Sequence, residues 1–253
     1  MHALPALRTQ TLTLLERMFQ RFASGIAPPV KVTMLDHFVY RYEVKSIEQA
    51  LIQKLARVVS GLHAADVLLE HGFLQELGAL HRILDEIGED ITFLAVARTN
   101  GGMTPMHERY LEAFYGEQMP PDLDVSKPVK GYDSPSRKEI RKYLKRVLMA
   151  DAPANFADAA IAKAYGGYVH AASQNTMDMY GGDPPRFHLR GMVGTPMQHD
   201  HAEGSWNYIY RGLLAFETAA KAFGDAAGLK VLRDYRLEHF AEFAAPSDAP
   251  VAG

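Results

Sequence analysis

The sequence predicts an all-α fold, a multi-helix bundle built on a central antiparallel helical hairpin between residues 46 and 97. Two series of apolar residues recur at alternating steps of three and four, which keeps one apolar stripe on each of two successive helices. The first series is Ile47, Leu51, Leu55, Val58, Leu62, Ala65 and Leu69, and the second is Phe73, Leu77, Leu80, Leu84, Ile87, Ile91 and Leu94. Gly72 stands between them and can take the left-handed conformation that ends a helix. Because each stripe must be buried, we expect the two helices to fold back on each other.

The composition is that of an ordinary globular protein. Of the 253 residues, 47% are hydrophobic and 23% are charged. A net charge of −3 argues against bulk attraction to nucleic acid or anionic membranes, and the absence of Cys excludes disulfides and thiolate chemistry. No apolar run reaches spanning length and no leader pattern is present, so we expect a cytoplasmic protein. The expected organisation is one helical domain over residues 1–244 and a disordered tail at 245–253.

A first helix is predicted ahead of the hairpin. Its inward face carries Leu7, Thr11, Leu15, Met18 and Phe22. Gly25, Pro28 and Pro29 end this helix. Val30 to Leu35 is interpreted as a short extended piece, and the aromatic segment Asp36 to Glu43 as a lead-in to the hairpin that can already be helical.

Two helices and a loop are predicted after the hairpin. Thr104 followed by Pro105 is a helix start signal, so Met106 to Tyr115 should be a short helix. Met119 to Ser134 is rich in Pro and polar residues and is predicted to be a long surface loop. Ser134 opens the next helix. Its inward residues are expected to be Ile140, Leu144, Val147 and Leu148.

The C-terminal part is predicted to contain two more helical regions. One runs from Asn155 to His170, and the other from about Ser205 to Phe243 with an interruption near Gly224 to Gly228. Gly181 to Gly204, rich in Gly, Pro and His, is expected to be irregular. Together with the hairpin, these segments make a bundle of about seven or eight helices.

The first candidate site lies in the segment Ala-Tyr-Gly-Gly-Tyr-Val-His. Gly166 and Gly167 each cost about 1 kcal/mol inside a helix, which indicates close approach of another backbone. Tyr165, Tyr168 and His170 are then predicted to line a small pocket for a polar ligand. The simpler alternative is a histidine that hydrogen-bonds to a neighbouring carbonyl within a helix seam.

The Tyr-Val-His step at 168–170, downstream of a helical hairpin carrying Arg82 and Glu86, resembles an uncharacterised all-helical bacterial family, a domain of unknown function. The resemblance covers Glu43 to Tyr180. It implies a bundle in which Arg82, Glu86, the tyrosines and His170 converge, and it brings no established activity. Taken alone, Arg82 and Glu86 are four apart and lie opposite the main apolar stripe, which favours a solvated pair.

The second candidate is a metal site at His199, His201 and Glu203. Alternate residues of an extended segment point the same way, so these side chains would offer two imidazoles and a carboxylate to zinc, iron or manganese. His188 is a potential fourth ligand. A cupin match is rejected because the Glu comes too early, and a di-iron bundle because Glu-x-x-His does not occur on two helices. The alternative is a loop that happens to contain His.

The third candidate is a basic helix. Its six cations are Arg137, Lys138, Arg141, Lys142, Lys145 and Arg146. They predict a positive surface for a protein or RNA partner. The alternative is a solvated face, or one that pairs with Glu86, Glu89 and Asp90 across the bundle.

These observations favour a binding or interaction protein over an enzyme. They leave the cofactor unknown. The alternative is a hydrolytic enzyme, either metal-dependent through residues 199–203 or similar to HEPN ribonucleases with His170 as general acid or base. HEPN enzymes pair an Arg with a His four to six residues later. Arg57 and His63 have this separation but do not share a helix face, and the position ahead of His170 is Lys163 or Ala164.

Overall fold

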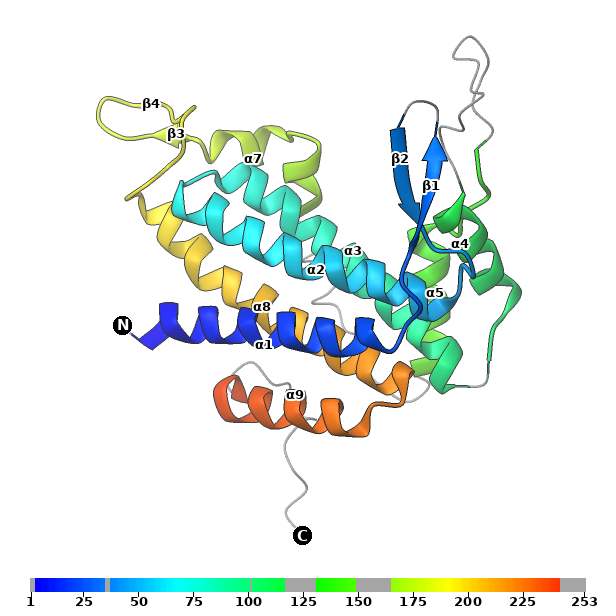
Figure 1. The fold of residues 1–253 in the computed structure, drawn as a ribbon. Coiled ribbons are helices and arrows are strands. Elements are labelled where there is room, and N and C mark those ends of the chain that lie inside the picture. Colours follow the sequence, from blue (N-terminus) through cyan, green and yellow to red (C-terminus); the bar gives the residue numbers. More distant parts are fainter. Residues whose placement is uncertain (1–2, 35–36, 101, 117–130, 149–164, 242–253) are drawn as a thin grey trace.

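The computed structural model describes residues 3–34, 37–100, 102–116, 131–148 and 165–241, and it confirms the all-α class (Figure 1). The long helices are α1 (Ala3–Ser24), α2 (Ile47–Glu70), α3 (Leu74–Thr99), α8 (Pro196–Phe223) and α9 (Ala226–His239). Shorter helices are α4 (Pro105–Tyr115), α5 (Arg137–Leu148) and α7 (Ser173–Met177), and residues 165–169 are also helical. Within these residues, no helix combines the length and apolar composition that a membrane crossing requires.

Three sequence predictions fall wholly or partly beyond this coverage. Most of the predicted loop at 119–134, the first part of the predicted helix at 155–170 and the tail at 245–253 lie outside the described residues. The end of the predicted 155–170 helix is described, and it is helical up to residue 169.

α2 and α3 are consecutive and run antiparallel. Arg98 pairs with Glu48 at 3.0 Å near one end, and Lys54 pairs with Asp90 at 2.7 Å further along. Gly72 makes the tight connection between them, because its φ of 68° is a left-handed conformation that a side chain would strain. The predicted helix break at this glycine is therefore observed.

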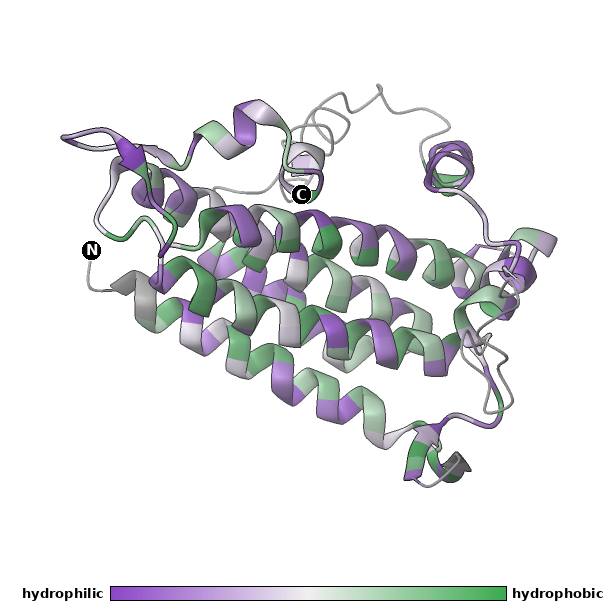
Figure 2. Cartoon of the chain, turned by 90° about the horizontal axis from the view of Figure 1, so that it is seen from above, coloured by the Kyte–Doolittle hydropathy of each residue, from purple (hydrophilic) through white to green (hydrophobic). Residues whose placement is uncertain are grey.

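The other long helices complete the core around the α2–α3 pair, with α8 as the helix that contacts all of them. α8 packs on α2 and α3, α1 packs on α2 and α8, and α9 packs on α8 (Figure 1). The largest fully buried side chains are Phe93, Phe216, Phe240, Leu15, Leu51, Leu55, Leu62, Leu77, Ile91, Leu94, Ile140 and Ile209. Figure 2 shows hydrophobic and hydrophilic residues alternating along each long helix, the pattern of helices that bury one stripe and expose another.

A β-hairpin projects from the bundle where the sequence analysis allowed a helix. β1 (Val30–Met34) pairs antiparallel with β2 (His37–Arg41), so the extended interpretation was correct and the helical one was wrong at 37–41. Phe38 and Tyr40 occupy alternate positions, which is the period of a strand and not of a helix. Both rings are exposed, at 50% and 59%.

α8 begins earlier than predicted. Thr195 caps it, with the threonine hydroxyl accepting from the Gln198 amide at 3.3 Å, and Pro196 occupies the first turn. Between α7 and α8 lie two very short strands, β3 (Tyr180–Gly181) and β4 (Arg186–Phe187). The predicted interruption is observed at Gly224, where φ is 70° and α8 gives way to α9.

Candidate functional site: a buried histidine between three helical segments

His81 lies where α3, α8 and residues 165–169 meet. Its side chain is 1% exposed although it is polar. The imidazole stacks on the ring of Tyr208 from α8, with centroids 3.7 Å apart and planes 6° from parallel. Tyr165 approaches the imidazole edge-on at 5.7 Å. Two aromatic rings therefore enclose the imidazole.

Among the residues that the structure describes, neither ring nitrogen of His81 has a hydrogen-bond partner. Both atoms are buried, and neither contacts a donor or acceptor at hydrogen-bonding distance. Burial lowers the pKa of His81 to about 3, and the positive charges of His201, Arg8 and Arg211 act in the same direction. The neutral ring therefore presents one N–H donor and one acceptor nitrogen that are both unmet, at a cost of about 1–3 kcal/mol each.

A buried carboxylate lies one turn along α3 from the histidine. Asp85 accepts a hydrogen bond from Arg211 at 2.7 Å and one from the hydroxyl of Tyr208 at 3.3 Å. Burial raises the pKa of Asp85 above its ordinary value, and the neighbouring guanidinium only partly offsets this. Burial and the nearby carboxylate also raise the pKa of Tyr208, which stays a hydrogen-bond donor. The cluster thus combines a neutral imidazole with an already engaged carboxylate.

Tyr168 holds residues 165–169 against α3. Its ring lies on Gly78, where an added Cβ would come within 2.6 Å of two ring carbons, so only glycine permits this approach. The hydroxyl donates to Asp178 at 3.2 Å, and burial is the main cause that raises the pKa of Tyr168 to about 12. The ring also meets His201 edge-on at 6.0 Å. The close approach of another backbone that was expected at Gly166 and Gly167 is therefore not observed, because a Cβ added at Gly166 would meet no described atom within 4 Å and Gly167 faces the side chain of Asn175. The glycine that a neighbour requires is Gly78 of α3.

The predicted ligand-binding residues occupy different environments. Tyr165 and Tyr168 pack toward α3, whereas His170 is exposed. Arg82 and Glu86 form the expected pair at 2.7 Å, with Glu86 38% exposed. One terminal nitrogen of Arg82, Nη1, is nevertheless buried without a hydrogen-bond partner. The structure therefore brings the two tyrosines to the cluster and leaves His170 at the surface.

The sequence analysis missed His81. A signal was present, because His81 is four residues after Leu77 and three before Leu84 and so lies on the apolar stripe of α3. A histidine on such a stripe is buried by the helix period alone. What the period does not say is whether its nitrogens find partners.

The expected geometry of the metal candidate is wrong, because its residues are helical and not extended. His199, His201 and Glu203 lie in the first turns of α8, where residues two apart point to different sides. His199 and Glu203 form an exposed pair at 3.3 Å, and the side chain of His188 contacts the carbonyl of Gly181 at 3.2 Å. In the part of the chain that the structure describes, no three His, Asp or Glu side chains are grouped to hold a metal ion.

The basic helix is α5, and two of its arginines pair across the bundle. Arg137 donates to Asp90 at 2.5 Å, and Arg141 donates to Glu89 at 2.8 Å. The cap is Ser136 and not Ser134, because its hydroxyl accepts from the Glu139 amide at 3.3 Å. Ile140 and Tyr143 of α5 are buried, at 0% and 8% exposure, and the predicted inward residues Leu144 and Val147 are half-buried against the core, whereas Leu148 is 47% exposed instead of facing inward. Lys138, Lys142, Lys145 and Arg146 are exposed.

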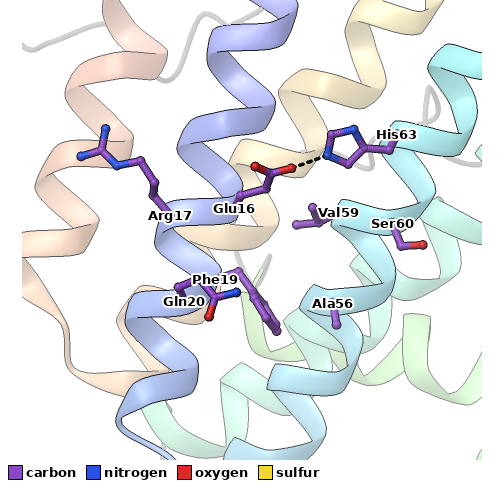
Figure 3. A pocket seen from close by; sticks show the side chains of 8 residues that line it. All are labelled: Glu16, Arg17, Phe19, Gln20, Ala56, Val59, Ser60 and His63. Atoms are coloured by element: carbon purple, nitrogen blue, oxygen red, sulfur yellow. Dashed lines mark hydrogen bonds and ion pairs between the residues drawn. The ribbon is translucent and has the colours of Figure 1, made fainter.

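A shallow groove lies between α1 and α2 on the described surface (Figure 3). Its lining is Glu16, Arg17, Phe19, Gln20, Ala56, Val59, Ser60 and His63. His63 and Glu16 meet at 2.7 Å across it, and both side chains are about half exposed, at 47% and 51%. Because solvent already satisfies these polar groups, the groove offers less specific chemistry than the buried cluster.

Comparison with known proteins gives no match to this chain among family models, curated proteins or solved structures. The resemblance to an uncharacterised bacterial family therefore stays a prediction. The fold and the site define an all-α bundle with an aromatic-enclosed, unsatisfied histidine, and its function has to be argued from that site.

Proposed function

We propose that this protein is a helical binding protein for a small polar ligand, with a site around His81, Tyr165 and Tyr168. One observation carries the proposal: within the described part of the chain, the buried imidazole of His81 has no hydrogen-bond partner at either nitrogen. Native proteins pair nearly all of their buried polar atoms, and the exceptions call for a specific explanation. A polar ligand that reaches the ring would supply the missing partners.

The chemistry of the cluster defines the kind of ligand. A neutral imidazole offers one donor and one acceptor, and a pKa of about 3 disfavours the cation that would recognise a carboxylate. Asp85 is engaged with Arg211 and Tyr208, so it is not free to bind a cationic ligand. The best match is an uncharged group with its own donor and acceptor, such as a primary amide, flat enough to lie beside the aromatic rings.

Two neighbouring features support this location. Arg82 follows His81 directly and also has a buried nitrogen without a partner, which adds another unmet donor on the same turn of α3. Tyr165 and Tyr168 belong to a short helical segment that covers this part of α3. His170 is left out of the proposed site because it is exposed.

We do not propose the hydrolytic alternative. His170 is at the surface, without the buried surroundings that tune a general acid or base. His199, His201 and Glu203 do not face one point, because α8 turns them apart.

The test compares His81→Phe, which keeps a ring of similar size without nitrogens, with His170→Ala as a matched surface control. A set of simple amides, including acetamide, benzamide and nicotinamide, is screened by thermal unfolding. A ligand at ten times its Kd stabilises a protein by about 1.4 kcal/mol, which for this size raises Tm by about 4 °C. We expect this shift in the wild type and in His170→Ala, and its loss in His81→Phe.

A second measurement follows the imidazole directly. In protein with ¹⁵N-labelled histidine, a bound amide should move the ring nitrogen resonances of His81 and leave those of the exposed His170 in place. Amides that stabilise His81→Phe as much as the wild type would overturn the proposal. So would the absence of any shift that depends on His81 across the whole set.

A further inference from the structure

The cations of α5 form two groups with different surroundings. Arg137, which is half-buried, pairs with Asp90 of α3, and Arg141, which is 41% exposed, pairs with Glu89 of α3. Only 3% of the Asp90 side chain is exposed, so the Arg137–Asp90 ion pair attaches α5 to a buried part of α3. These two pairs, together with the buried Ile140, determine which face of α5 is turned to solvent.

The outward face carries a line of three lysines. Lys138, Lys142 and Lys145 follow one another at steps of four and three, the spacing that places residues on one side of a helix. All three are exposed, and within the described residues none of them pairs with a carboxylate. Arg146 lies beside this lysine stripe, exposed, with its guanidinium over the ring of Tyr143 at 5.5 Å.

We propose that the lysine stripe, Lys138, Lys142 and Lys145, binds the phosphate backbone of a nucleic acid without reading its sequence. Seven residues of α-helix rise by about 10 Å. A nucleic-acid strand carries one phosphate per roughly 3.4 Å of duplex axis, so the stripe spans about three phosphates. The charges are therefore complementary in sign and comparable in spacing. Side chains with paired donors and acceptors for base edges are missing from the stripe, which makes the contact independent of sequence.

Two other anionic partners fit this face less well. A membrane-binding helix needs an apolar side to insert, but Ile140 and Tyr143 are buried at 0% and 8% exposure. A stable protein interface needs a desolvated aromatic or aliphatic centre. The exposed large aliphatic residue of α5 is Leu148, at 47%, and it lies at the end of the helix and not at the centre of the lysine stripe. A bare row of lysines is suited to a polymer of regularly spaced charges.

The expected salt dependence of the binding constant follows from the number of phosphates contacted. Neutralising three phosphates of a single strand predicts a slope of about −2 in log K against log salt concentration. Affinity should therefore fall about 20-fold between 50 and 200 mM NaCl. Because the chain carries a net charge of −3, binding is expected to be weak at the upper end of this range.

The experiment measures fluorescence anisotropy with three labelled probes: a 12-nucleotide oligouridylate, a 12-nucleotide oligothymidylate and a 12-base-pair DNA duplex. The triple variant K138A/K142A/K145A should bind at least tenfold more weakly at 50 mM NaCl and lose most of the salt slope. The matched control is K221A/K230A/R233A, which removes three exposed cations from α8 and α9 and changes the net charge equally. It should bind like the wild type, as should K138R/K142R/K145R.

Stripe-dependent binding of any of the three probes supports the proposal, and the relative affinities tell whether RNA or DNA is preferred. No binding to all three at 50 mM NaCl overturns it, and so does an equal loss in the control variant. Binding to polyglutamate in place of the oligonucleotides would assign the stripe to an acidic protein. His81→Phe should bind the probes like the wild type, because this surface is separate from the ligand site.

Discussion

Two buried histidines allow one end of α3 to be compared with the other. His107 is 0% exposed and stacks on Phe93 at 4.1 Å, much as His81 stacks on Tyr208. Nδ1 of His107 accepts from the Thr104 amide at 3.2 Å, and Nε2 donates to the Phe93 carbonyl at 3.0 Å. Neither nitrogen of His81 has such a partner. The two imidazoles are therefore equally buried, but only that of His107 has hydrogen-bond partners among the described residues.

The carboxylates beside the two histidines differ in the same way. Burial disfavours the ionised form of Asp90, but hydrogen bonds and charges from Arg137 and Lys54 outweigh it and hold its pKa below the ordinary value. Burial raises the pKa of Asp85, because the charges of Arg211 and Arg82 and the hydrogen bond from Tyr208 only partly offset it. Asp90 is thus fully paired, as a structural carboxylate should be, although Oε2 of the neighbouring Glu89 is buried without a hydrogen-bond partner among the described residues. The end near His81 retains unmet polar atoms, which is why we assign the ligand site there.

The largest expected effect is the loss of the satisfied carboxylate. Asp90→Asn leaves Lys54 and Arg137 facing a neutral side chain. Breaking a buried ion pair costs about 3–5 kcal/mol, and the partial exposure of Arg137 puts the expected loss near 3 kcal/mol. Urea unfolding followed by circular dichroism measures it. Asp85→Asn is the control and should lose about 1 kcal/mol or less, because the ionised form of Asp85 is already disfavoured by burial. An equal loss of stability in both variants would show that Asp85 and Asp90 are equally well paired.

A smaller effect should separate the two histidines. His107→Phe strands the Thr104 amide and removes the second hydrogen bond of the Phe93 carbonyl, at a cost of about 2 kcal/mol. His81→Phe removes two unmet polar atoms from an aromatic stack, and we expect a change within about 0.5 kcal/mol or a gain in stability. The measurement is the free energy of unfolding in urea without ligand. A loss for His81→Phe as large as for His107→Phe would show that the imidazole of His81 is satisfied after all.

The smallest effect concerns pH. The pKa of His81 is about 3 in the folded protein and 6.5 for the unperturbed side chain. Between these values the unfolded chain binds the proton and the folded one does not, so stability falls as pH drops from 6.5 toward 3. His81→Phe should flatten this dependence by at most about 1.4 kcal/mol per pH unit. Unfolding curves at pH 7, 6, 5 and 4 check it, with His170→Ala expected to follow the wild type. Parallel curves for wild type and His81→Phe would contradict the unpaired, neutral ring.

Local patterns accounted for most helices but not for how the site is assembled. The apolar stripes at 47–69 and 73–94 predicted α2 and α3, and the Thr104-Pro105 signal predicted α4. The same signal at Thr195-Pro196 marks the start of α8, so His199 and His201 are helical and not part of the irregular segment that was predicted. The alternation of Phe38 and Tyr40 likewise carried a strand signal that the aromatic content obscured.

The sequence by itself determined the helical class, the break at Gly72 and the burial of one face of each long helix, because these follow from the periodic placement of apolar side chains and from glycine conformation. Tertiary structure alone decided that Tyr165, Tyr208 and His81 share one cluster, since they come from three segments far apart in the chain. It also decided that Arg137, half-buried, pairs with the buried Asp90 while Lys138 faces solvent. A sequence lists potential hydrogen-bond partners, but only packing determines which of them meet.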